Sequence, residues 1–464
     1  MRTVAILAAA LCSVALRPVA GDELPGWLCH THRTFEELLS DDGLEVPCGR
    51  LTFGGELRHR YYDEADRIRP GGPGTAGYQQ WRWRNWLDYR ANGIGAYVEL
   101  VDASTFGESP LPETGIDVNR WDLQAAYVDL DLFERDGRPV VLRTGRQQLL
   151  YGAQRLISPP DFANIHRNWE GVRLSSPGET WDIDAFATRP VNAATGNGPL
   201  SRLDHERDRA DASRTFSGVY ATYHGRENHT LDVYWLWLRE QDEDAQPPRF
   251  ADGSRHTIGL RWAGKRPVAD ACGDPVRVWD WDLEGAYQFG HDEITETVRA
   301  GFFTAIVGHT WTALPWKPRL AALYYFGSGD DDPDDDENNT FSALFPLGHG
   351  YWGLIDNLSG QNLNQYSLQL TLAPATRLSL GAQLHWFELA SSGDVLYNVA
   401  GVPQGAPGTG REIGEELDLL FTYQISDSLT LHGGYSWFWY GTFVENNLPR
   451  DDARLLYLQT TWRY

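Results

Sequence analysis

Hydrophobic and polar residues alternate along most of this 464-residue chain. Between residues 277 and 289, for example, Trp279 and Trp281 alternate with Asp280 and Asp282. Successive side chains of an extended strand point to opposite faces of a sheet. The period of two therefore predicts strands that are apolar on one face and charged on the other.

Eighteen segments of this kind follow one another along the chain. Most have about ten to thirteen residues, which matches a tilted strand that crosses a membrane and exceeds the usual soluble strand. The predicted strands cover approximately residues 51–62, 78–90, 93–103, 119–132, 138–147, 168–175, 181–189, 214–224, 229–240, 254–264, 277–289, 295–308, 316–327, 363–374, 377–389, 413–425, 428–440 and 453–464.

The polar face of these segments carries too many full charges for a packed soluble core, so we expect one face to meet lipid and the other to meet water. The fold class predicted is all-β, a single closed antiparallel transmembrane β-barrel with a water-filled lumen. Barrels of roughly 16 to 18 strands enclose such a lumen.

The last segment supports closure. In residues 453–464, Leu456, Leu458 and Trp462 share one face, and the chain ends on the aromatic Tyr464. In lipid no strand can leave its backbone groups unpaired, so the last strand is expected to pair with the first. This ending is typical of bacterial outer-membrane barrels.

The connections alternate between short and long. Links such as 373–376 and 426–428 are predicted to be periplasmic turns. The predicted extracellular links are 63–77, 104–118, 190–213, 328–362 and 390–412. The longest contains an acidic run whose Asp330, Asp332, Asp334 and Asp336 are a weak calcium candidate, since carboxylates are hard oxygen ligands. The alternative is a solvated run, because no calcium-loop spacing is present.

The N-terminal residues 1–20 combine an early cation, an apolar stretch and a small residue, and we expect a secretory signal peptide that is cleaved near Ala20. Residues 21–50 are then a periplasmic segment and 51–464 the barrel. Cys29 and Cys48 are a possible disulfide in an oxidising compartment. Cys272 has no assigned role.

The amino-acid composition further limits the classes of protein to which this chain could belong. No apolar run after the N-terminus reaches the ~18 residues of a membrane helix. Aromatic residues make up 12% of the chain, which suits the girdles of a membrane barrel but also a carbohydrate-binding sandwich. The net charge of -24 argues against nucleic acid as a partner. Lysine occurs only at Lys265 and Lys317, so arginine supplies nearly all positive charge, through codon bias or through a need to grip carboxylates.

One region carries a specific resemblance. The matching residues are Gly145-Arg146-Gln147, Tyr151-Gly152, Arg155-Leu156, Asn164, Arg167 and Gly171-Val172-Arg173, with weaker matches at 185–191, 345–349 and 414–418. In these motifs the chain resembles the alginate-export family of outer-membrane β-barrels, from about residue 50 to the end. The resemblance implies an 18-stranded barrel that passes a polyuronate through an arginine-lined constriction.

The candidate pathway residues follow from the alternation and from these motifs. Alternation points Arg58, Arg60, Arg82 and Arg84 inward from the first two strands. The motifs add Arg143, Arg146, Gln147, Arg155, Arg167 and Arg173, several of them in a connection that could fold into the lumen. Confined guanidinium groups attract carboxylates. The alternative is that these arginines pair with lumenal carboxylates and only stiffen the barrel.

The negative net charge of the chain differs from the arginine-lined constriction that the resemblance implies. Acidic residues are also predicted to face the lumen, namely Asp88, Glu99, Asp280, Asp282, Glu284, Glu416 and Asp418. The sequence therefore predicts the fold more firmly than the solute.

The resulting hypothesis is an outer-membrane channel for an anionic polysaccharide or an acidic sugar. The rival within transport is a porin for uptake of small acidic solutes or oligosaccharides. An enzyme embedded in the barrel and a soluble carbohydrate-binding protein are the other classes, but no His-x-x-x-His, Cys-x-x-Cys or phosphate loop is present. We expect no cofactor, a monomer, contact with outer-membrane lipid and lipopolysaccharide, and insertion by the barrel-assembly machinery.

Overall fold

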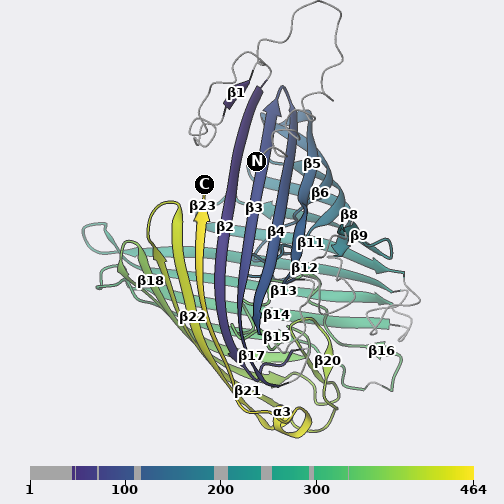
Figure 1. The fold of residues 1–464 in the computed structure, drawn as a ribbon, viewed down its shortest axis with the longest axis vertical. Helices are drawn as coiled ribbons and strands as arrows, with labels where there is room; N and C mark the ends of the chain where they lie inside the picture. The colour runs from purple at the N-terminus through teal and green to yellow at the C-terminus, as the bar shows by residue number, and fades with distance from the viewer. Residues whose placement is uncertain are drawn as a thin grey trace, which may run out of the picture.

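The computed structural model describes residues 44–46, 49–69, 73–108, 116–192, 207–241, 253–291, 297–332 and 334–464, and it consists almost entirely of antiparallel strands. One sheet contains 21 strands, of which β1, β9 and β16 are short additions, and the remaining 18 close into a barrel (Figure 1). Within the described residues, no helix is long and apolar enough to span a membrane.

The barrel strands are β2 Gly49–Ala65, β3 Thr75–Ala91, β4 Ile94–Glu108, β5 Asn119–Arg135, β6 Arg138–Gln147, β7 Trp169–Ser176, β8 Trp181–Asn192, β10 Arg214–Tyr223, β11 His229–Glu240, β12 Ser254–Ala269, β13 Pro275–His291, β14 Thr297–Thr310, β15 Arg319–Gly327, β17 Leu363–Ala375, β18 Leu378–Leu389, β21 Glu412–Gln424, β22 Leu429–Tyr440 and β23 Ala453–Arg463. The short elements are β1 Leu44–Val46, β9 Arg209–Ala210, β16 Glu337–Asn338, β19 Leu396–Tyr397, β20 Pro403–Gln404 and α3 Thr442–Asn447.

The first and last barrel strands close the sheet, as the C-terminal pattern predicted. β2 and β23 lie side by side (Figure 1), with Leu57 opposite Trp462 in the antiparallel register. The seam continues to the final residue, because Gly55 N donates to Tyr464 O at 2.8 Å and Tyr464 N donates to Gly55 O at 3.1 Å. Every barrel strand therefore has two neighbours, and the sheet has no free edge.

All 18 predicted strands are present, and the differences lie at their ends. One correction concerns the predicted strand 316–327, which begins only at Arg319. Trp316 and Lys317 have φ of 62° and 43°, and the left-handed backbone followed by Pro318 forms a turn. The short elements were not predicted.

The two faces of the strands differ as predicted. Trp81 and Trp83 point outward and are 40% and 37% exposed, whereas Arg82 between them points inward and is 1% exposed. The exposed aromatic and aliphatic side chains of the outer surface suit contact with acyl chains.

Long and short connections lie at opposite ends. Turns such as 92–93, 376–377 and 425–428 lie at the end where the chain terminates, and α3 lies at the other end (Figure 1). In an outer-membrane barrel these are the periplasmic and extracellular ends, respectively.

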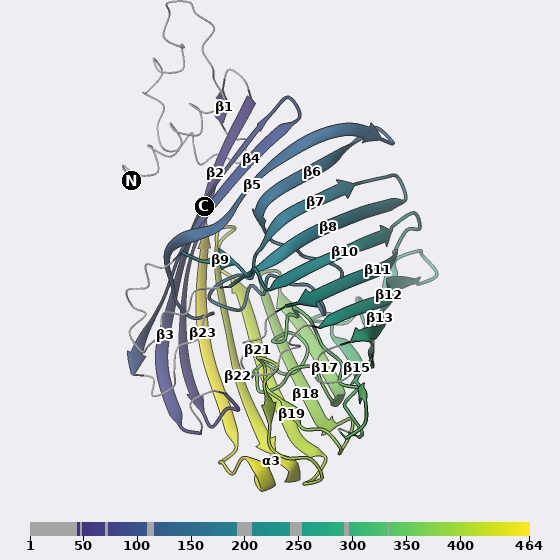
Figure 2. The same cartoon turned by 90° about the vertical axis from the view of Figure 1, so that its right-hand side faces the viewer.

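Inserted connections partly fill the extracellular half of the lumen. Irregular coil occupies the space between the strands (Figure 2). Two connections, residues 148–168 and 328–362, pack apolar side chains such as Ile157, Phe345 and Trp352 against the inner wall near the extracellular ends of the strands. This half of the lumen thus has an apolar core, which periodicity could not reveal because the connections have no regular period.

Candidate functional site in the barrel lumen

Residues 148–168, between β6 and β7, form the first inserted segment. Gly152 and Gln154 have φ of 53° and 62°, which turns the chain sharply inward. Pro159 and Pro160 cannot donate to a ladder, so the segment stays irregular. Its backbone carbonyl groups consequently need donors from elsewhere.

Arginines of β2 and β3 supply those donors. Arg58 donates to Asp161 O at 2.6 Å and to Ala163 O at 2.9 Å, and Arg82 donates to the same two oxygens at 3.1 Å each. Arg60 donates to Phe162 O at 2.7 Å, and its guanidinium carbon lies 3.9 Å from the centre of the Phe162 ring.

These three arginines face the lumen as predicted, but each is only 1% exposed. A guanidinium group offers five donors in a fixed fork, which suits it to several carbonyl oxygens at once. Arg58, Arg60 and Arg82 therefore hold the inserted segment in place, and their guanidinium groups are covered by it. Of the three, only Arg82 also pairs with a carboxylate of a neighbouring strand, Glu56, as the structural alternative expected.

The His166 side chain also helps to hold the inserted segment in place. His166 Nδ1 lies 3.0 Å from Gln148 Nε2, and His166 Nε2 lies 2.8 Å from Asp161 Oδ1 and 3.1 Å from an Arg82 guanidinium nitrogen. Burial and the charges of Arg84 and Arg82 lower the pKa of His166 to about 3. The ring is neutral at physiological pH.

Arg155 and Arg167, both motif residues, also bind protein groups. Arg155 donates to Asp282 at 2.9 Å and to Glu284 at 2.7 Å on β13. Arg167 donates to Ser158 O at 3.0 Å. Both guanidinium groups therefore fix the course of the first segment.

The second inserted segment meets the first across the lumen. Leu347 N donates to Gln154 O at 2.9 Å, and residues Ile157 and Phe345 form a short parallel bridge. The second segment is fastened to the far wall, where Ile355 N donates to Glu416 at 2.9 Å. We call the two segments together the lumenal insert.

Below the insert, toward the periplasmic end, a second group of arginines is partly exposed. Arg84, Arg90 and Arg143 have 16%, 46% and 18% of their side-chain surface accessible. Arg143 and Arg90 both bind Asp129, at 2.7 Å and 2.8 Å, and Arg84 binds Glu99 at 2.5 Å.

An aromatic row supports this group. Trp86, Tyr97 and Tyr127 stack along the inner wall, with ring centres 6.3 Å and 5.0 Å apart, and Arg143 lies 3.6 Å over the Tyr127 ring. The wall therefore offers alternating guanidinium and carboxylate groups on a rigid base, which we call the periplasmic-side lumen wall.

The other predicted pathway residues lie on β6 and β7. Arg146 binds Glu170 at 2.7 Å and the carbonyl groups of Leu123 and Asp208. Gln147 is fully buried, and Arg173 lies 3.9 Å from Asp184. Arg146 is also buried, whereas Arg173, which lies opposite Arg143 in the register, has 20% of its side-chain surface accessible.

Sequence reasoning missed the carbonyl-binding role of the arginines, and with it Asp161, Asn164 as a partner of Arg58, and His166. The consecutive prolines at 159 and 160 were a usable signal that the connection is not a strand. No signal indicated that residues 328–362 fold inward.

The remaining candidates add no site. Within the described ranges, no group of three or more His, Cys, Asp or Glu side chains is arranged to hold a metal ion, so the acidic run at Asp330–Asp336 gains no support as a calcium site. Cys29 and Cys48 lie outside the described residues. Cys272 is exposed and has a free thiol.

A closed barrel of 18 antiparallel strands, apolar outside and charged inside, is the architecture of a bacterial outer-membrane channel. The alginate export family matches residues 49–457, and the chain belongs to that family. Among curated proteins, none matches this sequence.

Solved structures share the fold at low identity. OccD3 (OpdP) of Pseudomonas aeruginosa is 14% identical, with a TM-score of 0.58 over 91% of this chain and 92% of that chain. OccAB4 of Acinetobacter baumannii is 9% identical, with a TM-score of 0.58 over 90% and 99%. The outer membrane protein OprD from Pseudomonas aeruginosa is 12% identical, with a TM-score of 0.55 over 89% and 93%. The family and the fold are those of transport channels.

Proposed function

We propose that this outer-membrane channel passes acidic saccharides, that is, chains or units of sugar that carry both carboxylates and hydroxyl groups. The observation that carries the proposal is the periplasmic-side lumen wall, where partly exposed Arg84, Arg90 and Arg143 alternate with Asp88, Glu99 and Asp129. Guanidinium groups bind carboxylates bidentately, and carboxylates accept hydrogen bonds from sugar hydroxyl groups.

The pairing within the wall favours passage over tight binding. An incoming sugar carboxylate replaces a wall carboxylate on Arg90 or Arg143, so one charged hydrogen bond is exchanged for another. Conduction requires binding that is favourable at entry and weak enough for release. The family name supports a polyuronate as the solute, since the chain belongs to the alginate export family.

The second candidate is a porin for small acidic solutes. The lumenal insert favours it, because the bridge between Ile157 and Phe345 joins two segments across the lumen. A polymer would need these segments to separate, whereas a small solute would not.

Single-channel recording in planar bilayers tests the proposal. We expect short oligouronates to block the current, and neutral oligosaccharides of equal length to block it much less. R90Q and R143Q should weaken the oligouronate block, while R377Q, in a periplasmic turn, should leave it unchanged. Equal block by neutral and acidic oligomers would contradict the proposal. Block only by monomers and dimers would favour the second candidate.

Three further expectations stay proposals. We infer that residues 1–20 are removed on secretion, that the barrel-assembly machinery inserts the protein, and that it works as a monomer. Mass spectrometry and cross-linking of the protein from outer membranes test all three.

A further inference from the structure

Exposed cations without partners gather at the periplasmic ends of β11–β15. Arg226 precedes β11, Arg266 and Arg277 lie near the end of β12 and the start of β13, and Lys317 precedes β15. Within the described part of the chain, none of these four has an ion pair or side-chain hydrogen bond. Elsewhere in the barrel, most arginines are paired, and the whole chain carries a net charge of -24.

The strand cations among them face outward. Arg266 lies opposite Trp279, and Arg277 lies opposite Val268, in the antiparallel register of β12 and β13. Trp279 and Val268 are outer-surface residues with 47% and 39% exposure. The two guanidinium groups therefore project from the membrane-facing side, away from the lumen.

An aromatic row accompanies them. Trp279 packs on His309 at a ring-centre distance of 4.4 Å, and His309 packs on Trp311 at 4.3 Å. The turn 311–318 then presents Leu314 and Trp316, which are 50% and 56% exposed. Aromatic rings at such a level mark the boundary between acyl chains and headgroups.

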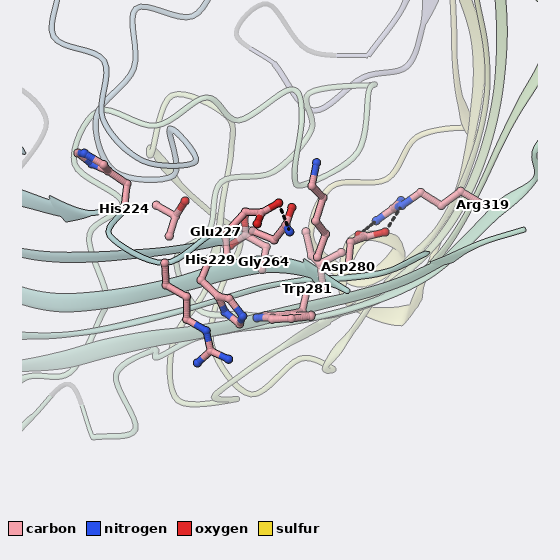
Figure 3. Close-up of a pocket in the computed structure, with 14 residues that line it drawn as sticks. His224, Glu227, His229, Gly264, Asp280, Trp281 and Arg319 are labelled. Atoms are coloured by element: carbon pink, nitrogen blue, oxygen red, sulfur yellow. Dashed lines mark hydrogen bonds and ion pairs between the residues drawn. The ribbon is translucent and has the colours of Figure 1, made fainter. Parts of the chain in front are cut away.

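A cavity of about 660 Å³ at the same end of β11–β13 is lined by residues from both faces of the sheet (Figure 3), so only its outward part belongs to this rim. Arg226, His229, Lys265 and Trp281 are among its lining residues. In Figure 3, His229 and Trp281 lie on one side of the sheet, and Asp280 and Arg319 lie on the other. Gly264 lets the Trp281 ring pack against the backbone, since a Cβ there would approach the ring to 2.6 Å.

Two of the three carboxylates in this region accept hydrogen bonds within their own turns. Asp270 accepts from Cys272 N and Asp274 N within its own turn, and Glu227 accepts from Asn228. Asp274 is the third nearby acid. They lie in the turns beyond the strand ends, whereas Arg266 and Arg277 lie on the strands.

We propose that this rim, defined by Arg226, Arg266, Arg277, Lys317, His229, Trp279, Trp281 and Trp316, binds the headgroup of an anionic phospholipid in the periplasmic leaflet. Guanidinium groups grip phosphate in a bidentate manner, and a net negative headgroup such as phosphatidylglycerol complements cations that the protein leaves unpaired. The site lies outside the lumen and is independent of the solute.

The choice of occupant follows from position. A transported solute stays inside the barrel, whereas Arg266 and Arg277 project outside it at the level of the aromatic row. A ligand there must combine a phosphate with acyl chains that reach the apolar outer wall. A phospholipid meets both conditions.

The test compares two sets of unpaired outward arginines. The rim variant is R266Q/R277Q/K317Q. The matched control is R189Q/R239Q/R454Q, whose arginines are also exposed, outward and unpartnered within the described chain, but lie at the extracellular ends of β8, β11 and β23.

Each protein is placed in vesicles of phosphatidylethanolamine alone or with one-fifth phosphatidylglycerol, and the unfolding rate in urea is measured. We expect phosphatidylglycerol to slow unfolding of the parent and the control about fivefold, and to leave the rim variant unaffected. Native mass spectrometry should show phosphatidylglycerol retained by the parent and the control.

An equal lipid effect on all three proteins, or none on the parent, would overturn the proposal. So would an equal effect of soluble glycerol phosphate, because it would show that no membrane lipid is needed. If the triple variant does not fold, the single variants R277Q and K317Q are used, and unchanged lipid retention in both would count against the site.

Discussion

The backbone N–H of Phe345 donates a hydrogen bond of 2.9 Å to the carbonyl oxygen of Leu156, and Phe345 O accepts one of 2.8 Å from Ser158 N. These contacts join a connection that starts at β6 to one that starts at β15. The lumenal insert is thus a pair of loops joined by backbone hydrogen bonds, and each loop is anchored separately to the wall. We call the hydrogen bonds between Leu156–Ser158 and Phe345 the latch. Passage of a polymer depends on whether this latch opens.

A disulfide across the latch separates the two transport candidates. Ile157 and Phe345 are bridge partners, so I157C/F345C places two thiols close enough to cross-link. If a polymer passes, oxidation should abolish flux of long oligouronates, and a reductant should restore it. The single variants I157C and F345C are the controls. Undiminished polymer flux through the cross-linked barrel would show that the latch does not open during passage.

Arg82 is predicted to be the most costly anchor to lose. It binds Glu56, Asp161 Oδ1 and two carbonyl oxygens while only 1% exposed. R82A leaves Glu56 buried without this partner, and we expect a loss of about 3 kcal/mol in the free energy of unfolding. It should also make the single-channel current noisier. R377A, which removes an exposed pair in a turn, should leave both unchanged.

Gly145 of the Gly-Arg-Gln motif is predicted to be required because of its backbone conformation and the lack of room for a side chain. Its φ is 126°, it lies opposite Gly171 with φ of 153°, and a Cβ at residue 145 would collide with Ala126 O. G145A should therefore destabilise the barrel by about 1–3 kcal/mol. G285A is the control, because a Cβ there comes no closer than 3.4 Å to any atom. Heat-induced unfolding followed by gel mobility measures both, and equal midpoints would refute the assignment.

Acid should loosen the insert through His166. The packed ring has a pKa of about 3, whereas an unpacked ring takes up a proton near 6.5. Because the pKa is lowered by packing, the stabilisation is complete above pH 6.5 and is lost as the pH falls toward 3. The loss is at most about 1.4 kcal/mol per pH unit. Current fluctuations should increase between pH 7 and pH 4.5, and H166N should reduce this increase. A pH-independent record in the parent would contradict the role of His166.

The strands could be predicted because each places its side chains with a fixed period. Trp81, Arg82 and Trp83 show this directly, since neighbouring residues face lipid, lumen and lipid. The start of β15 was misplaced because the apolar residues of the turn 311–318 resemble a strand, while the left-handed conformation of Trp316 and Lys317 is a backbone property.

The interior could be predicted only in part. The inward direction of Arg58 and Arg82 followed from alternation, but their partners did not. Those partners are carbonyl oxygens of Asp161 and Ala163, which every residue type possesses. Contacts of this kind depend on where an irregular connection folds, and the sequence holds no period that reports it.

Flux from vesicles tests the central claim most directly. The purified protein is reconstituted with trapped oligouronates and with neutral oligosaccharides of equal length, and release of each is followed over time. The account predicts faster release of the acidic oligomer, and loss of that preference in R90Q/R143Q with neutral release unchanged. Equal release of both oligomers from the parent, or an intact preference in the double variant, would contradict it.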